Sequence, residues 1–80
     1  MNMILTAEQY EVLYKVARNT GMDCWFCIQQ DSSGDYVYDL EEGKRMSIRE
    51  GIRLLAEGYQ PCGLSEAEIR VFEELISRRA

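Results

Sequence analysis

Hydrophobic positions recur with helical spacing in three segments of the chain, and each segment opens with the same cap residues. Thr6, Ser47 and Ser65 each precede such a segment, and a Gln or Glu follows three residues later. The hydroxyl can accept a bond from the third helical amide, while the Gln or Glu side chain bonds back to the cap amide. The pattern predicts helices over about 7–19, 48–57 and 66–79.

The apolar stripe of each predicted helix indicates the side that faces the core. The residues expected to point inward are Tyr10, Leu13, Tyr14, Val16 and Ala17 in the first helix, Ile52, Leu55 and Ala56 in the second, and Ile69, Phe72, Leu75 and Ile76 in the third. Gly51 lies inside the second helix, where glycine is less favourable than alanine.

Two segments between the first two helices, CWFCIQQ (24–30) and DYVYDL (35–40), are rich in aromatic and β-branched residues. The residues DSSG between them are typical of a turn. We therefore expect a β-hairpin with a three-residue loop, Ser32–Gly34, in which Gly34 is left-handed. The segment EEGKR then connects the hairpin to the second helix.

A three-residue loop also fixes the expected register of the hairpin. It pairs Ile28 with Tyr38 and Phe26 with Leu40 on the face that packs against the core. The opposite face then carries Trp25, Cys27, Gln29, Val37, Asp39 and Glu41. Residues Met3–Leu5 are a candidate for a short third strand.

These elements predict one small α+β domain over residues 1–80, in the order helix, strand, strand, helix, helix. An antiparallel hairpin, with the candidate third strand beside it, is expected to pack against the three helices. The composition, 46% hydrophobic and 29% charged, is that of a globular protein. A chain of 80 residues has little room for a deep cleft in addition to a core.

The charge and the residue types exclude several classes of function from our expectation. The net charge is −5, whereas nucleic-acid-binding proteins cluster Lys and Arg, so direct binding to nucleic acid is not expected. Histidine, the most common general base and metal ligand, is absent. We expect neither an enzyme nor a cofactor. Because the sequence has neither a membrane-length apolar run nor a signal-peptide pattern at its start, we expect a cytoplasmic protein.

The spacing of Cys24 and Cys27 leaves three interpretations open. A redox C-x-x-C pair lies at the start of a helix, whereas this pair lies in a strand-like segment. Zinc needs four ligands, and one such pair supplies two of them. A zinc site would therefore require a dimer in which the second copy contributes its own pair. Cys24 and Cys27 are therefore weak candidates for metal ligands, and we favour the interpretation that they are small apolar residues of a strand.

Trp25 is difficult to explain as a core residue, because the expected register places it on the second face of the hairpin. An aromatic and aliphatic patch around Trp25 and Val37, with Asp39, Glu41 and Gln29 at its rim, is typical of a binding surface. We therefore expect a small non-catalytic protein–protein interaction module or regulator. Its protein partner is not specified by the sequence, and a homodimer that pairs hairpin edges is one form it can take.

The main alternative is an acidic inhibitor of a nucleic-acid-handling enzyme, which would present carboxylates where phosphates bind. In size and charge the chain resembles small acidic proteins of phages and mobile elements, including anti-CRISPR proteins, some of which act in this way. No motif carries this resemblance. It implies a dense acidic face, whereas the glutamates here are spread over all three predicted helices and interleaved with arginines.

Overall fold

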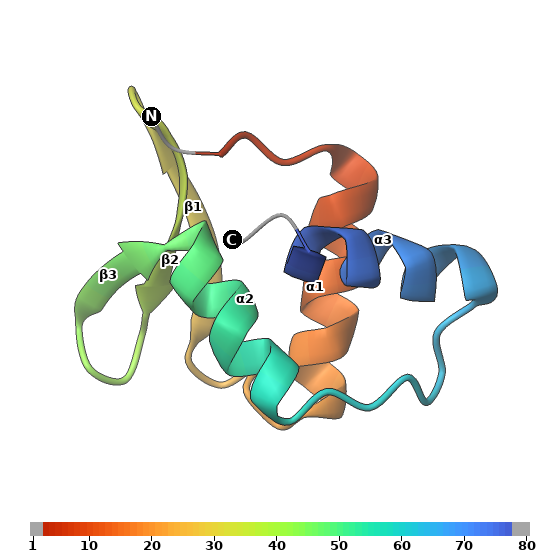
Figure 1. Cartoon of the computed structure of the whole chain (residues 1–80). Coiled ribbons are helices and arrows are strands. Elements are labelled where there is room, and N and C mark those ends of the chain that lie inside the picture. Colours follow the sequence, from red (N-terminus) through yellow and green to blue (C-terminus); the bar gives the residue numbers. More distant parts are fainter. Residues whose placement is uncertain (1–2, 78–80) are drawn as a thin grey trace.

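The computed structural model describes residues 3–77, which form three helices and one three-stranded antiparallel sheet. In chain order the elements are α1 (Ala7–Asn19), β1 (Phe26–Asp31), β2 (Gly34–Asp39), β3 (Lys44–Ser47), α2 (Ile48–Glu57) and α3 (Glu66–Ser77). Figure 1 shows the sheet on one side of the molecule and the helices on the other. The predicted α+β class is confirmed, but the sheet has a further strand, β3, where the sequence pattern predicts only a connection.

The predicted helix starts are confirmed by their hydrogen bonds. The Thr6 hydroxyl accepts a bond from the Gln9 amide at 3.1 Å, and the Gln9 side chain accepts one from the Thr6 amide at 2.9 Å. Ser65 and Glu68 cap α3 in the same reciprocal way. At α2 the Ser47 hydroxyl accepts a bond from the third helical amide. The helices α1 and α2 have the predicted bounds, and the predicted residues beyond position 77 lie outside the described residues.

One hydrophobic core joins the helices to the inner face of the sheet. Its buried side chains are Leu5, Val12, Leu13, Val16, Ala17, Phe26, Ile28, Val37, Ile48, Ile52, Leu55, Phe72 and Leu75. Most of the predicted stripes contribute to it, whereas Tyr10, Tyr14, Ala56, Ile69 and Ile76 are only partly buried. The helix α2 contacts β2, β3, α1 and α3, so it lies at the centre of the packing.

Gly51 is the point at which α2 comes closest to the sheet. A Cβ atom at this position would lie 2.6 Å from Cγ2 of Val37 and 3.4 Å from the Phe26 ring, so there is no room for a side chain. The glycine that weakens α2 as an isolated helix therefore allows the helix backbone to pack directly on β2.

The predicted register of the hairpin is wrong by one residue. The strand β1 pairs with β2 so that Ile28 lies opposite Val37 and Phe26 lies opposite Asp39. The loop has two residues, Ser32 and Ser33, in place of the predicted three. Because successive side chains of a strand point to opposite faces, this shift turns every side chain of β2 to the other face.

Hydrogen bonds from Ser33 to the Asp31 side chain account for the shorter loop. The Asp31 carboxylate accepts bonds from the Ser33 amide at 2.9 Å and the Ser33 hydroxyl at 2.8 Å, which tightens the turn. Gly34 follows with a φ of 125°, a conformation that L side chains rarely adopt. The Asp35 side chain, only 2% exposed, is then free to point inward.

The segment before α1 is fixed to the hairpin by the buried Asp35. The Asp35 carboxylate accepts a bond from the Leu5 amide at 2.6 Å, and the Asp35 amide donates to the Met3 carbonyl at 3.0 Å. Residues 3–5 thus lie beside β2, past the end of β3, but they do not form a strand. The candidate third strand at Met3–Leu5 is a hydrogen-bonded extended segment, and the third strand of the sheet is β3.

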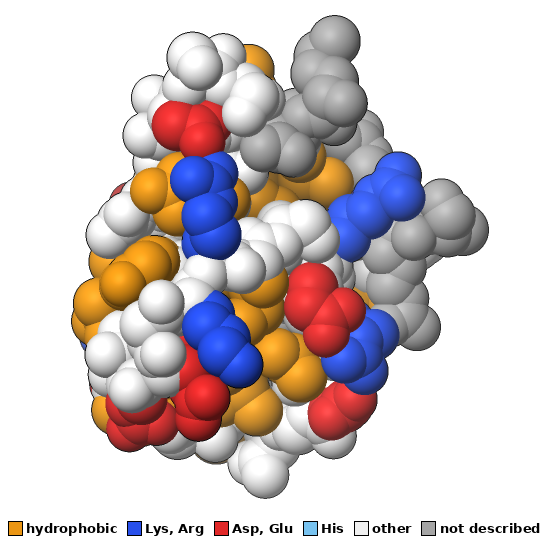
Figure 2. All heavy atoms as spheres, turned by 90° about the vertical axis from the view of Figure 1, so that its left-hand side faces the viewer, with side chains coloured by type: hydrophobic (Ala, Val, Ile, Leu, Met, Phe, Trp, Pro, Cys, Tyr) orange, Lys and Arg blue, Asp and Glu red, His pale blue; other side chains and the backbone are white. Residues whose placement is uncertain are grey.

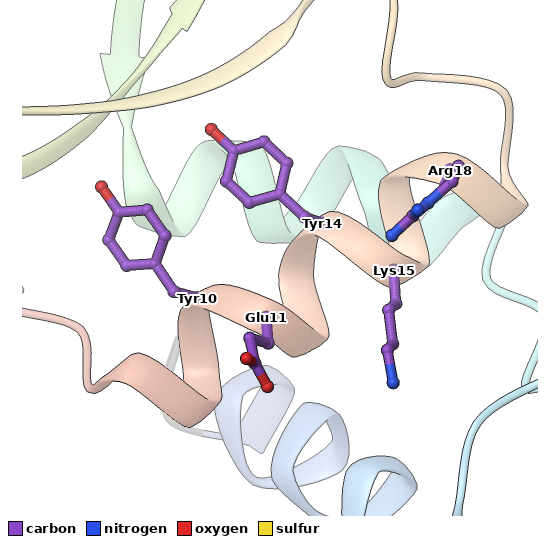
Figure 3. Close-up of a pocket in the computed structure, with 5 residues that line it drawn as sticks. All are labelled: Tyr10, Glu11, Tyr14, Lys15 and Arg18. Carbon is purple, nitrogen blue, oxygen red and sulfur yellow. The ribbon is translucent and has the colours of Figure 1, made fainter.

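Two tyrosines of α1 bind the free edge of β1 at Ile28. The Tyr14 hydroxyl accepts a bond from the Ile28 amide at 2.7 Å, and the Tyr10 hydroxyl donates to the Ile28 carbonyl at 3.4 Å. Figure 3 shows both rings pointing from α1 toward the strand. The predicted inward stripe of α1 therefore includes two residues that bind the edge of the sheet and lie at the margin of the core.

Within residues 3–77, no helix is both long enough and apolar enough to cross a membrane.

Candidate functional site

The candidate site is the outward face of the sheet, on the side away from the helices (Figure 1). The side chains that alternate onto this face are Cys27, Gln29 and Asp31 of β1, Tyr36 and Tyr38 of β2, and Arg45 of β3. They are all exposed or partly buried. We call this set the open face.

The structure separates the six residues that the sequence predicts for a binding surface. Cys27 and Gln29 belong to the open face, but Val37 is 1% exposed and packs in the core beneath Gly51. Its assignment to the surface is wrong, because the one-residue shift in register turns it inward. The binding role of the remaining residues stays a prediction.

The other three predicted residues lie at one end of the sheet. Trp25 is half-buried in the turn that precedes β1, and its ring packs edge-on against Phe26 with the ring centroids 5.8 Å apart. Asp39 is the last residue of β2 and lies directly opposite Phe26, so the shifted register places it on the inner side of the sheet and its predicted place beside Cys27 is wrong. Glu41 lies in the following turn. We call this region, residues 23–25 and 39–43, the turn end of the open face. The end next to Ser32 and Ser33 is the tip end.

The tip end is organised around Tyr36, which the predicted register places in the core. The Tyr36 hydroxyl donates to the Gln29 side-chain oxygen at 2.9 Å. The guanidinium carbon of Arg45 lies 3.8 Å from the centre of the Tyr36 ring, a cation–π contact. The same guanidinium donates to Asp31 at 2.5 Å. These contacts hold an arginine and a tyrosine in fixed positions on the surface.

The electrostatics of the tip end reflect this arrangement. The hydrogen bond from Arg45, followed by the bonds from the Ser33 amide and hydroxyl, lowers the pKa of the Asp31 carboxyl to about 2. The hydrogen bond to Asp31 in turn raises the pKa of Arg45. Both groups are therefore charged at neutral pH, and their charges neutralise each other.

Asp39 shapes the turn end through its side chain and its backbone. The Asp39 carboxylate accepts bonds from the Glu41 and Glu42 amides, both at 2.9 Å, and its carbonyl accepts one from the Gly43 amide at 2.8 Å. This turn displays Leu40, whose side chain is 55% exposed. The predicted core contact between Phe26 and Leu40 is therefore wrong.

The turn before β1 lies next to this exposed leucine. The Leu40 amide donates to the Trp25 carbonyl at 2.9 Å, so the pairing of the two strands continues for one further bond. Trp25 and Leu40 are therefore neighbours along the backbone pairing, but the Trp25 side chain packs against the core, whereas Leu40 and the glutamates of the turn are exposed.

The cysteines are free thiols that occupy different structural positions. Cys27 lies in β1, as predicted, whereas Cys24 lies in the preceding turn. Desolvation and the neighbouring Glu41 carboxylate raise the pKa of the Cys24 thiol, which favours the protonated form over the thiolate that binds metals. Within residues 3–77, no group of three or more His, Cys, Asp or Glu side chains is placed to hold a metal ion.

A shallow hollow of about 420 Å³ lies along α1 and is lined by Tyr10, Glu11, Tyr14, Lys15 and Arg18 (Figure 3). Its two tyrosine hydroxyls are already bonded to β1, and Lys15 forms an ion pair with Glu68 at 2.5 Å. The hollow therefore has few polar groups left to bind a ligand, and we assign no site to it.

In comparisons with known proteins, no protein-family model matches this sequence, and no curated protein or solved structure is significantly similar to it. The function is therefore argued from the geometry and chemistry of the open face.

Proposed function

We propose that this protein is a non-catalytic protein–protein interaction module and that it binds its partner through the open face of the sheet. The observation that carries the proposal is the preorganised tip end, in which Arg45 is stacked on Tyr36 and bonded to Asp31. Tyrosine and arginine are the residue types that, with tryptophan, dominate the binding energy of protein interfaces. Because their positions are already fixed, less conformational entropy is lost when a partner binds.

The two edges of the sheet are poorly suited to pairing with a strand of a partner, which favours binding through the open face. At Ile28, near the middle of β1, the strand edge is occupied by the hydroxyls of Tyr10 and Tyr14. The strand β3 has only four residues and begins with Lys44 and Arg45. Short strands and edge lysines are features that oppose the addition of another strand. A partner is therefore better accommodated on the open face than alongside it.

The alternative function, an acidic inhibitor of a nucleic-acid-handling enzyme, has weaker support. A mimic of nucleic acid needs rows of carboxylates that are free to meet basic groups. Several carboxylates of the described residues instead lie in ion pairs within the chain, namely Lys15–Glu68, Arg45–Asp31, Arg53–Glu50 and Arg53–Glu57. We therefore retain this function only as the second candidate.

The proposal is tested by affinity purification from cells that express the tagged chain, with quantitative mass spectrometry of the proteins that co-purify. Tyr36→Ala and Arg45→Ala are compared with the wild type. Arg70→Ala is the matched control, because it removes the same charge from an exposed position of α3. We expect a partner whose recovery falls roughly tenfold or more in the two open-face variants and is unchanged in the control.

The same proteins are examined by circular dichroism and by native mass spectrometry. Retained folding of Tyr36→Ala separates a binding defect from unfolding. If native mass spectrometry finds a dimer that Tyr36→Ala dissociates, the partner is a second copy of the chain. If both open-face variants bind every partner as the wild type does, the open face is not the binding surface and the proposal is wrong.

A further inference from the structure

The two ends of the open face differ in charge. At the tip end, Asp31 and Arg45 neutralise each other. The turn end contains Asp23, Asp39, Glu41 and Glu42, and its nearest basic residue in the sequence is Lys44. Figure 2 views the molecule from the side of the sheet and shows hydrophobic side chains between charged groups, with more acidic side chains in the lower half than at the top and basic side chains beside them.

The turn end also displays apolar surface at a defined position. Leu40 is one of two large hydrophobic residues that are strongly exposed within residues 3–77. The bonds from Glu41, Glu42 and Gly43 to Asp39 fix the turn that carries it, and the Leu40 amide is bonded to the Trp25 carbonyl. A partner that covers the open face therefore meets an apolar contact next to several negative charges.

We infer that the partner of the open face places a basic segment, a hydrophobic side chain flanked by Lys or Arg, on the turn end at Leu40, Glu41 and Glu42. The inference rests on the proposed function and names the chemistry of its partner. It is carried by charge complementarity, because a neutral or acidic segment would leave these carboxylates uncompensated when it excludes water from them. The net charge of −5 would also steer a basic partner toward the protein.

Not every carboxylate of the turn end has the same part in this contact. The Asp39 carboxylate is engaged by the two backbone amides of its own turn and maintains the shape of that turn. Glu41 and Glu42 are exposed, and no ion pair within residues 3–77 involves them. These two glutamates are therefore the groups expected to meet the partner's cations.

The experiment uses three synthetic pentapeptides with blocked ends, KKLKK, KKSKK and EELEE, titrated into the isotope-labelled protein and followed by two-dimensional NMR. KKLKK is expected to shift the amide signals of residues 23–25 and 40–43. KKSKK should bind less tightly because it lacks the apolar side chain, and EELEE should not shift these signals. Affinity for KKLKK should fall as the salt concentration rises from about 50 to about 300 mM, because added salt screens the attraction between the lysines and the glutamates.

Two charge variants provide the matched comparison. Glu41→Gln with Glu42→Gln should weaken KKLKK binding about fivefold, the order expected for two exposed ion pairs. The control, Glu66→Gln with Glu73→Gln, removes the same charge from exposed positions of α3 and should leave binding unchanged. Equal losses in both variants would mean that only net charge attracts the peptide, and would overturn the inference.

Failure of this inference is distinguishable from failure of the proposed function. If KKLKK shifts only signals of the tip end, if EELEE binds equally well, or if no peptide shifts residues 23–25 and 40–43, the basic-partner inference is wrong. None of these results alters the effect of Tyr36→Ala on the natural partner. That effect alone decides whether the open face is used.

Discussion

The two faces of the sheet are built from the same three strands, yet they differ in burial. The inner face is mainly apolar and buried, whereas the open face carries polar side chains that solvent can reach. On the inner face Phe26, Ile28 and Val37 are buried, and the one buried carboxylate, Asp35, is bonded to the Leu5 amide. On the open face the polar side chains bond mainly to each other and remain accessible to solvent. The inner face therefore carries the stability of the fold, whereas the open face can change with little structural cost.

The sharpest test of this comparison uses adjacent residues of β2. Val37→Ala should lower the free energy of unfolding by about 2–3 kcal/mol, because it removes buried methyl groups and leaves a cavity. Tyr38→Ala, on the open face, should cost about 1 kcal/mol or less. Urea unfolding followed by circular dichroism measures both. The opposite ranking would restore the register predicted from the sequence, in which Tyr38 faces the core and Val37 faces solvent.

A second test concerns the contact between α2 and the inner face. In an exposed helix Gly→Ala is stabilising by about 1 kcal/mol. Gly51→Ala should instead destabilise the protein by about 1–3 kcal/mol, because the new methyl group would overlap with Val37.

Gly58→Ala is the control for this substitution. A Cβ atom at Gly58 would meet Thr20 at 3.6 Å, an ordinary contact, and the φ of Gly58 is −110°. Thermal unfolding of the two variants should therefore differ clearly. In the double variant Gly51→Ala with Val37→Ala the cost should be smaller than the sum of the single costs, and strict additivity would contradict the proposed overlap.

The smallest expected effect is on the open face and depends on pH. The pKa of Asp31 in the folded protein, about 2, lies below its ordinary value of 3.8, so the ionised carboxylate favours the folded state. This stabilisation is complete above about pH 4 and is lost as the pH falls toward 2. Arg45→Gln should raise the pKa of Asp31 toward its ordinary value, as measured by NMR titration of the carboxyl carbon. An unchanged pKa would mean that Arg45 does not hold this carboxylate.

Much of the fold was predictable because its signals are local. The starts of α1 and α3 depend on a hydroxyl and a Gln or Glu three residues apart, and that of α2 on the Ser47 hydroxyl, and all of these bonds form within one turn. The apolar periodicity of α1 and α2 likewise reflects local geometry, so their bounds are those that the sequence indicates.

The errors in the hairpin register arise where a side chain forms a hydrogen bond that cannot be inferred from the pattern of apolar residues. The Asp31 carboxylate shortens the hairpin loop by binding Ser33, and the inward position of Asp35 depends on Leu5, which is 30 residues away. The aromatic residues of DYVYDL fit either face of a strand, so composition did not distinguish the two registers. A closer reading of the DSSG segment as a side-chain-stabilised turn would have favoured the shorter loop.

The same one-residue error decided how much of the candidate site was predicted. Cys27 and Gln29 lie on β1, whose faces were assigned correctly, so they reach the open face. Tyr36 was missed because it lies on β2, whose register was predicted one residue off. Arg45 was missed because it lies on β3, and the composition of the segment EEGKR does not indicate a strand. The sequence thus indicated two residues of the open face, Cys27 and Gln29, but not Tyr36 and Arg45 at its tip end.

The tyrosines that bind the edge of β1 at Ile28 have a consequence for how this protein behaves at high concentration. An uncovered strand edge is a template on which further chains can stack into cross-β assemblies. Here Tyr10 and Tyr14 bond to both backbone groups of Ile28 from within the chain. These two bonds leave no free backbone group at Ile28 on which another chain could begin to stack, so this position of the β1 edge opposes sheet growth.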